Sequence, residues 1–203
     1  MTAYAQRERR LLADLLLRLG PDEPTLCEGW TTRDLAAHLV VRDRRPDAAA
    51  GAMIGPLRSH GERVRLQTAA RPYAEVVHEV RTPPWWSPVS NRLVDEAANT
   101  IEFFVHHEDA RRAQPDWAPR ALDPGLETAL WRNVKFTGRL VLRRSGSAVE
   151  VRSPGYGSFT VGDNPATTLT GPPGELAMFL TGRREHARVT IEGDGLRDAR
   201  LGL

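Results

Sequence analysis

Two side chains that could bind a metal ion lie one helical turn apart near the middle of the chain. Glu102 and His106 are separated by four residues in an apolar stretch that is expected to be helical, so both side chains lie on one face. A carboxylate and an imidazole on a buried stripe destabilise a fold unless they pair or bind a cation. Their spacing therefore indicates either an ion pair within the helix or part of a metal site.

A third donor, His38, lies on the apolar face of an earlier expected helix. Two facing helices of a bundle would bring His38 to Glu102 and His106, which gives a set of two histidines and one carboxylate with open positions, as in catalytic zinc and non-haem iron sites. Asp109, one turn beyond His106, is placed to accept a hydrogen bond from the other ring nitrogen of a ligating histidine. A hydrogen-bonded core histidine beside an ion pair explains the same pattern, and both interpretations stay open at this point.

Other side chains near these helices each have two interpretations. His107 points about 100° away from His106 around the helix, so it is the less favoured ligand, although a slight rotation of the helix would exchange the two. Cys27 lies in the loop before the second expected helix, and we expect a small buried apolar residue rather than a nucleophile. Trp85 and Trp86, in a proline-rich loop, either cover a pocket or close one end of the bundle.

The elements that position these residues are expected to be helices. Leucines recur at helical spacing from Ala3 to Leu19, and Gly20-Pro21 ends that pattern. The segment Thr31-Thr32-Arg33-Asp34 has the form of a capping box, which begins a helix that ends before Pro46. Further helices are expected over residues 56–81, divided by Pro72, and over residues 90–113 and 124–142.

The character of the chain changes after Arg144. Short segments of alternating polarity, separated by turn residues, predict strands over residues 148–152, 159–161, 167–170 and 187–192. An apolar segment over residues 174–181 predicts a short helix. The expected fold class is therefore α+β and mostly α, with a helical domain over residues 1–143 and a small α/β domain over residues 144–203.

Composition limits the class of protein. The 203 residues are 40% hydrophobic and 27% charged, which is enough for a core. No run approaches the roughly 18 apolar residues of a membrane span, and no apolar segment of a signal peptide follows the first arginines. Cys27 is the only cysteine, which excludes an internal disulfide. We therefore expect a cytoplasmic protein with no membrane partner.

The net charge of +2 arises almost entirely from arginine, since Lys135 is the only lysine. Arginine pairs are spread along the chain and are matched by nearby acids. A nucleic-acid interface would instead gather the cations on one face, with aromatic residues between them. Solvated helix faces are the favoured interpretation, so we expect no nucleic-acid partner.

Three segments resemble one family when they are taken in order. Pro24–Leu39, PTLCEGWTTRDLAAHL, resembles the opening of the DinB-like, mycothiol-dependent maleylpyruvate isomerase family, which has a Trp, a helix cap, Arg-Asp-Leu and a histidine ligand. Glu102–Asp109, EFFVHHED, resembles the family's later Glu-x-x-x-His-x-x-Asp run. Gly174–Arg183, GELAMFLTGR, followed by a strand and Gly-Asp, is similar to the family's C-terminal domain.

The resemblance implies a DinB-like four-helix bundle followed by a small C-terminal domain. It implies a divalent metal, usually zinc, on His38, Glu102 and His106, with Asp109 as the acid of the second run. It also implies a metal-bound mycothiol thiolate that attacks a small electrophile, in an isomerase or a thiol transferase. The alternative is a non-catalytic metal or small-molecule binding protein of the same fold, and either is expected to be a monomer or a homodimer.

Arg183 is the candidate substrate contact of the C-terminal domain, which is shorter here than in the family pattern. It follows an apolar helix, so one expected role is to complete the C-terminal end of that helix. The other is to hold a substrate carboxylate through a bidentate pair, which suits the planar guanidinium group better than an ammonium group.

Overall fold

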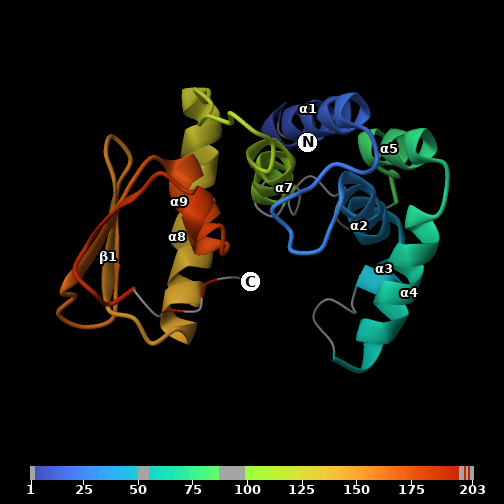
Figure 1. Ribbon diagram of the computed structural model, residues 1–203. Coiled ribbons are helices and arrows are strands. Elements are labelled where there is room, and N and C mark those ends of the chain that lie inside the picture. Colours follow the sequence, from blue (N-terminus) through green and yellow to red (C-terminus); the bar gives the residue numbers. More distant parts are fainter. Residues whose placement is uncertain (1–2, 50–54, 87–98, 197–198, 200, 202–203) are drawn as a thin grey trace. The chain divides into compact units, whose positions relative to one another are not determined.

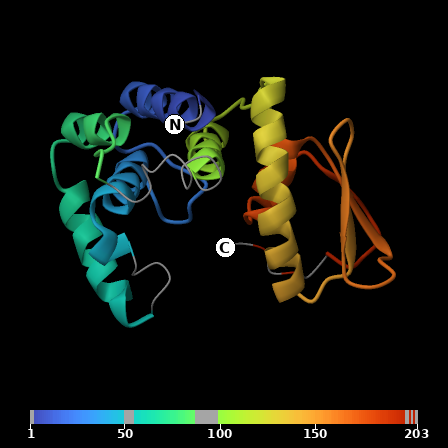
Figure 2. The same ribbon diagram turned by 180° about the vertical axis from the view of Figure 1, so that it is seen from behind.

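The computed structural model describes residues 3–49, 55–86, 99–196, 199 and 201 (Figure 1 and Figure 2). The chain forms two compact units, Met1–Ala118 and Pro119–Leu203. The described part of the first unit is helical, and the second combines helices with a four-stranded sheet. The predicted class, α+β and mostly α, is confirmed. Among the described residues, every helix is too short or too polar to cross a membrane.

The helices of the first unit follow the predicted pattern closely. The break expected at Pro72 separates two helices, because proline cannot donate a hydrogen bond inside a helix. The helix predicted over residues 90–113 is described from Thr100 onward, and residues 90–98 lie outside the described part. The elements are α1 (Ala3–Leu19), α2 (Thr32–Arg44), α3 (Pro46–Ala49), the 3₁₀ turn η2 (Gly55–Leu57), α4 (Arg58–Ala69), α5 (Tyr73–Arg81) and α7 (Thr100–Arg112).

Local hydrogen bonds define where α1 ends and where α2 begins. Gly20 adopts a φ of 85°, and its N–H donates to the carbonyl oxygen of Leu16 at 3.0 Å. The carboxylate of Asp34 accepts hydrogen bonds from the N–H and the hydroxyl of Thr31 at 3.1 and 2.9 Å, which confirms the capping box. This start fixes the helical phase of α2, and with it the face on which His38 lies.

One apolar core joins α1, α2, α5 and α7, which lie next to one another in Figure 1. Burial of large aliphatic and aromatic side chains is the main stabilising term for such a group of helices. The core includes side chains of both α2 and α7 and so positions the faces that carry the candidate ligands. Its fully buried members include Leu12, Leu16, Leu35, Leu39, Val77, Val80 and Phe103.

A buried ion pair connects the same four helices. Nη1 of Arg9 on α1 lies 2.5 Å from Oδ2 of Asp43 on α2, and it also donates to the carbonyl oxygen of Val80 on α5 at 2.7 Å. The guanidinium group lies 4.0 Å from the ring centroid of Phe103 on α7. Both charges are almost fully buried, so each depends on the other for its solvation.

The second unit is a small sheet with two helices against one face (Figure 1 and Figure 2). The strand order is β2-β1-β3-β4, in which β1 is antiparallel to β2 and parallel to β3, and β3 is antiparallel to β4. The strand predicted over residues 187–192 is paired only over Thr190–Glu192. The elements are α8 (Pro124–Arg144), β1 (Val149–Ser153), β2 (Gly157–Val161), β3 (Thr167–Thr170), α9 (Pro173–Leu180), the 3₁₀ turn η5 (Arg184–His186) and β4 (Thr190–Glu192).

The two units divide after Ala118, and not after residue 143 as the sequence predicted. Helix α8 belongs to the second unit because it packs against α9 and the sheet. The rings of Trp131 and Phe159 lie 5.7 Å apart, and a Cβ added at Gly138 would lie 3.0 Å from both Leu180 and Phe159. An amphipathic pattern shows that a helix has a buried face, but it does not show which element covers that face.

Candidate metal centre

His38 on α2 comes together with Glu102 and His106 on α7. The Nε2 atoms of His38 and His106 each lie 3.5 Å from Oε1 of Glu102. The two imidazole rings meet edge to face, with centroids 5.2 Å apart. One ligand atom of each residue lies within 4.8 Å of the other two. Residues that are 64 positions apart in the chain therefore form one cluster, here called the triad.

The triad has the spacing of ligands around one metal ion. Nitrogen and oxygen ligands at about 2.0–2.2 Å from a tetrahedral zinc ion lie about 3.3–3.5 Å from one another. The two nitrogen–oxygen distances of 3.5 Å match this separation. The side chains of His38 and Glu102 are each 28% exposed, which leaves an approach for a small ligand. Two imidazoles and one carboxylate form a donor set that suits zinc or non-haem iron.

Asp109 orients the ring of His106. The carboxylate of Asp109 is fully buried, and its Oδ2 lies 2.9 Å from Nδ1 of His106. Because Nδ1–H donates to this carboxylate, Nε2 faces the triad, where it can offer a lone pair once its own proton is displaced. This is the contact that the spacing of the two residues predicted.

Arg42 is a residue of the site that the sequence analysis missed. Its Nε lies 3.2 Å from Oε1 of Glu102, and its Nη2 and Nη1 donate to Asn99 at 2.6 Å and to Asp43 at 3.1 Å. Arg42 follows His38 by four residues, so the signal was its position on the same face of α2. Its guanidinium group gives Glu102 a counter-charge within the protein.

Burial and hydrogen bonding set the protonation of the triad. Burial lowers the pKa of His38, which favours the neutral imidazole that metals bind. Burial opposes the charged form of Glu102, but hydrogen bonds from His106 and His38 hold its pKa well below the usual value. Burial also opposes the charging of His106, but hydrogen bonds with Asp109 and Cys27 raise its pKa well above the usual value. A metal ion that binds Nε2 of His106 would displace a proton from the imidazole.

The loop between α1 and α2 brings two side chains to the site. The ring of Trp30 packs against His38 with centroids 5.2 Å apart. The Cys27 thiol donates to Oδ2 of Asp109 at 3.2 Å, and the N–H of Leu26 donates to the main-chain oxygen of Asp109 at 3.1 Å. Cys27 is only half-buried. Cys27 packs against the apolar core, as expected for a small apolar residue, and its thiol is also a hydrogen-bonding neighbour of the site.

The structure separates the two adjacent histidines of α7. Nδ1 of His107 lies 2.9 Å from Oε2 of Glu8 on α1, and both side chains are buried in the core. His106, and not His107, joins His38 and Glu102. The difference follows from the step of about 100° between neighbours on a helix.

Arg183 lies at the C-terminal end of α9 in the second unit. Its main-chain N–H donates to the carbonyl oxygen of Met178 at 2.9 Å, and its Nη1 donates to that of Thr181 at 2.6 Å. The predicted role at the helix end is confirmed, and a contact with substrate stays a prediction. In the first unit, Trp85 is 91% exposed and Trp86 is 50% exposed. These exposures contradict a buried plug at the end of the bundle.

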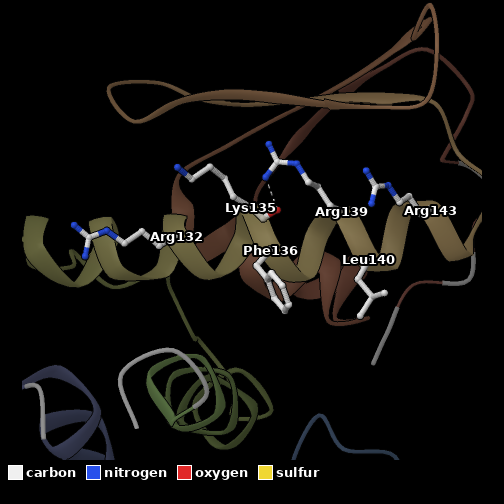
Figure 3. A pocket seen from close by; sticks show the side chains of 6 residues that line it. All are labelled: Arg132, Lys135, Phe136, Arg139, Leu140 and Arg143. Carbon is white, nitrogen blue, oxygen red and sulfur yellow. Dashed lines mark hydrogen bonds between the residues drawn. The ribbon is translucent and has the colours of Figure 1, made fainter. Parts of the chain in front are cut away.

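A surface hollow of about 360 Å³ on the second unit contains none of the predicted site residues. Figure 3 shows that the side chains around it all project from α8, with Phe136 and Leu140 on one side of the helix. The side chains that line this hollow are basic or apolar. The lining residues are Arg132, Lys135, Phe136, Arg139, Leu140 and Arg143.

Comparisons of the chain with protein families, with curated proteins and with solved structures found no match. Within the described residues, two groups of His, Cys, Asp and Glu have the spacing of metal ligands, and both include His106.

Proposed function

We propose that this protein binds a divalent metal ion, most favourably zinc, through His38, Glu102 and His106 in a DinB-like helical bundle. The observation that carries the proposal is the meeting of two Nε2 atoms at one carboxylate oxygen, each at 3.5 Å. Two further features support it. Asp109 directs Nε2 of His106 toward the triad, and burial lowers the pKa of His38 and so favours its ligating form.

We further propose an enzyme of the DinB-like, mycothiol-dependent maleylpyruvate isomerase family, acting as an isomerase or a thiol transferase. When bound, a divalent ion deprotonates a coordinated thiol at neutral pH, which would make mycothiol a nucleophile toward a small electrophile. The chain supplies the rest. His38 and His106 donate Nε2 lone pairs, and Asp109 holds the Nδ1 proton of His106. The carboxylate of Glu102 offsets part of the positive charge of the ion.

Arg183 is the proposed contact for an anionic group of the thiol or the substrate. A planar guanidinium group binds a carboxylate through two parallel hydrogen bonds. The proposed compartment is the cytoplasm, because a reducing environment suits both a thiol cosubstrate and a single cysteine that is not in a disulfide.

Zinc titration of the purified chain after treatment with a chelator tests the ligand set. A Cys27→Ala background removes the neighbouring thiol, so that the triad alone is titrated. In this background His38→Ala and His106→Ala should each abolish tight binding, because each removes one of three protein ligands. His78→Ala is the matched control, since His78 is exposed on α5, and it should bind zinc normally.

Circular dichroism of each variant distinguishes a lost ligand from a lost fold. If folded His38→Ala and His106→Ala chains both retain stoichiometric zinc, the ligand set is wrong.

Turnover of an electrophile panel with mycothiol, with and without chelator, separates the enzyme from the alternative. Consumption of an electrophile that stops on addition of chelator supports the enzyme. Stoichiometric zinc without any turnover favours a non-catalytic metal or small-molecule binding protein of the same fold.

A further inference from the structure

His106 also takes part in a second group of donors, on the other edge of its ring. Nδ1 of His106 lies 2.9 Å from Oδ2 of Asp109 and 3.9 Å from Sγ of Cys27. The same Sγ lies 3.2 Å from the same Oδ2. A sulfur, a nitrogen and an oxygen thus surround one point, while Nε2 of the same imidazole faces the triad.

The three distances suit one metal ion. A point in the plane of the three atoms lies about 2.0 Å from each of them. Zinc binds nitrogen and oxygen at about 2.0–2.2 Å and sulfur at about 2.3 Å, so an ion slightly above this plane fits with little movement. The two shorter distances are also those of hydrogen bonds to Asp109. The separation of 3.9 Å between Sγ and Nδ1 is that of a weak sulfur hydrogen bond, and it is slightly longer than the roughly 3.5 Å between two ligands of one zinc ion.

The backbone holds these donors in place before any ion binds. Asp109 is fully buried on α7, and its main-chain oxygen accepts a hydrogen bond from the N–H of Leu26 at 3.1 Å. The main-chain N–H of Cys27 donates to the hydroxyl of Thr25 at 3.2 Å, and its main-chain oxygen accepts from Trp30 at 2.9 Å. The loop that carries the thiol is therefore tied to the helix that carries the other two donors, which limits the entropy lost on binding.

We propose that Cys27, Asp109 and Nδ1 of His106 form a second site for a zinc-type divalent ion, which shares the imidazole of His106 with the triad. The thiolate favours zinc or cobalt over magnesium or calcium. Three protein ligands leave one tetrahedral position for water or a small ligand. The site goes beyond the proposed function, because it uses neither His38 nor Glu102.

Binding at the second site is an exchange of protons for a metal ion. The ion forms bonds to Sγ of Cys27, Nδ1 of His106 and Oδ2 of Asp109. The Nδ1 proton that Asp109 holds while the second site is empty and the thiol proton both pass to solvent, and no electron is transferred. With an ion on each nitrogen, the imidazolate of His106 bridges the two sites.

Titration with cobalt(II) under a phosphine reductant tests the second site. Cobalt serves as a spectroscopic probe of zinc sites, and a bound thiolate adds a charge-transfer band in the near ultraviolet. Because Cys27 is the only cysteine in the chain, any such band comes from this residue. We expect wild-type protein to bind two ions per chain and to show the band. Cys27→Ala should lose the band and one of the two ions.

The matched variant is the double substitution His38→Ala with Glu102→Gln, which removes the triad and leaves the second site. It should keep the band and bind one ion per chain. Binding of one ion by the wild type without the band would contradict the second site and leave the proposed function standing. No binding at all would contradict both.

Two other results would also overturn the shared site. A thiolate band with only one ion per wild-type chain would contradict the sharing of His106. A band that grows with protein concentration would assign the thiolate to an ion held between two chains.

Discussion

Replacement of Asp109 with asparagine tests how the triad is held in position. Asparagine preserves the volume of the side chain, and its oxygen still accepts a hydrogen bond from Nδ1 of His106. The negative charge at 2.9 Å from this nitrogen is lost, so the imidazole becomes a weaker base and a weaker ligand. The side chain of Asp109 is fully buried, so water does little to compensate for the loss of its negative charge.

The expected loss of zinc affinity follows from such changes at other metal sites. Removal of a partner that orients a ligand weakens metal binding about 10- to 100-fold, which corresponds to about 1.4–2.7 kcal/mol. Asp109→Asn should fall near the lower limit because the acceptor is retained. Asp109→Ala should fall near the upper limit because the acceptor is removed as well.

Competition with a chromophoric chelator measures the zinc affinity, in the Cys27→Ala background that isolates the triad. Glu108→Gln is the control, since Glu108 is a buried acid on the same helix that pairs with Arg112 instead of the triad. It should lower stability and leave the zinc affinity unchanged. If Asp109→Asn binds zinc as tightly as its parent, Asp109 does not orient His106 and the reasoning fails.

Three further predictions concern the second unit and the framework of the first. Arg183→Lys should leave the Tm unchanged, because the main-chain N–H of this residue makes the hydrogen bond at the end of α9. The same substitution should weaken the binding of an anionic thiol adduct, measured by calorimetry. An unchanged affinity would mean that Arg183 acts only at the end of the helix. Asp43→Asn should lower the free energy of unfolding in urea by about 3–5 kcal/mol, since the buried charge of Arg9 would lose the carboxylate that neutralises it, and a loss below about 1 kcal/mol would contradict this. Burial opposes the ionised form of Asp34, but a hydrogen bond from Arg65 lowers its pKa below 3.8. The ionised carboxylate of Asp34 stabilises the fold above pH 3.8, and this stabilisation is lost as the pH falls through the lower pKa of Asp34 in the folded chain. The Tm difference between Asp34→Asn and wild type should therefore shrink from about pH 6 to about pH 2. A constant difference would contradict an ionic contribution.

Local patterns predicted most of the elements that build the site. The leucine spacing of α1, the capping box at Thr31 and the break at Pro72 are all confirmed, because each depends on residues that are close in the chain. The meeting of His38 with α7 was one of two interpretations that the pattern left open, because both helices showed a donor on an otherwise apolar face, and the family resemblance favoured it. A patterned helix reveals which of its faces is buried before its partner is known.

Pairings between distant elements could not be read from the sequence in the same way. Helix α8 belongs to the second unit because α9 packs against it, and no residue near α8 in the chain indicates this pairing. The contact of Arg42 with Glu102 and that of His107 with Glu8 join different helices. Buried charges need partners, but many acids in the chain were equally available to these side chains before the fold was known.

Diffraction at the zinc absorption edge, from crystals of the zinc-loaded chain, would locate the metal ion directly. We expect an anomalous peak about 2.0–2.2 Å from Nε2 of His38, from Nε2 of His106 and from a carboxylate oxygen of Glu102. A map without a peak between these three atoms, in which Glu102 pairs only with the two histidines and Arg42, would contradict it.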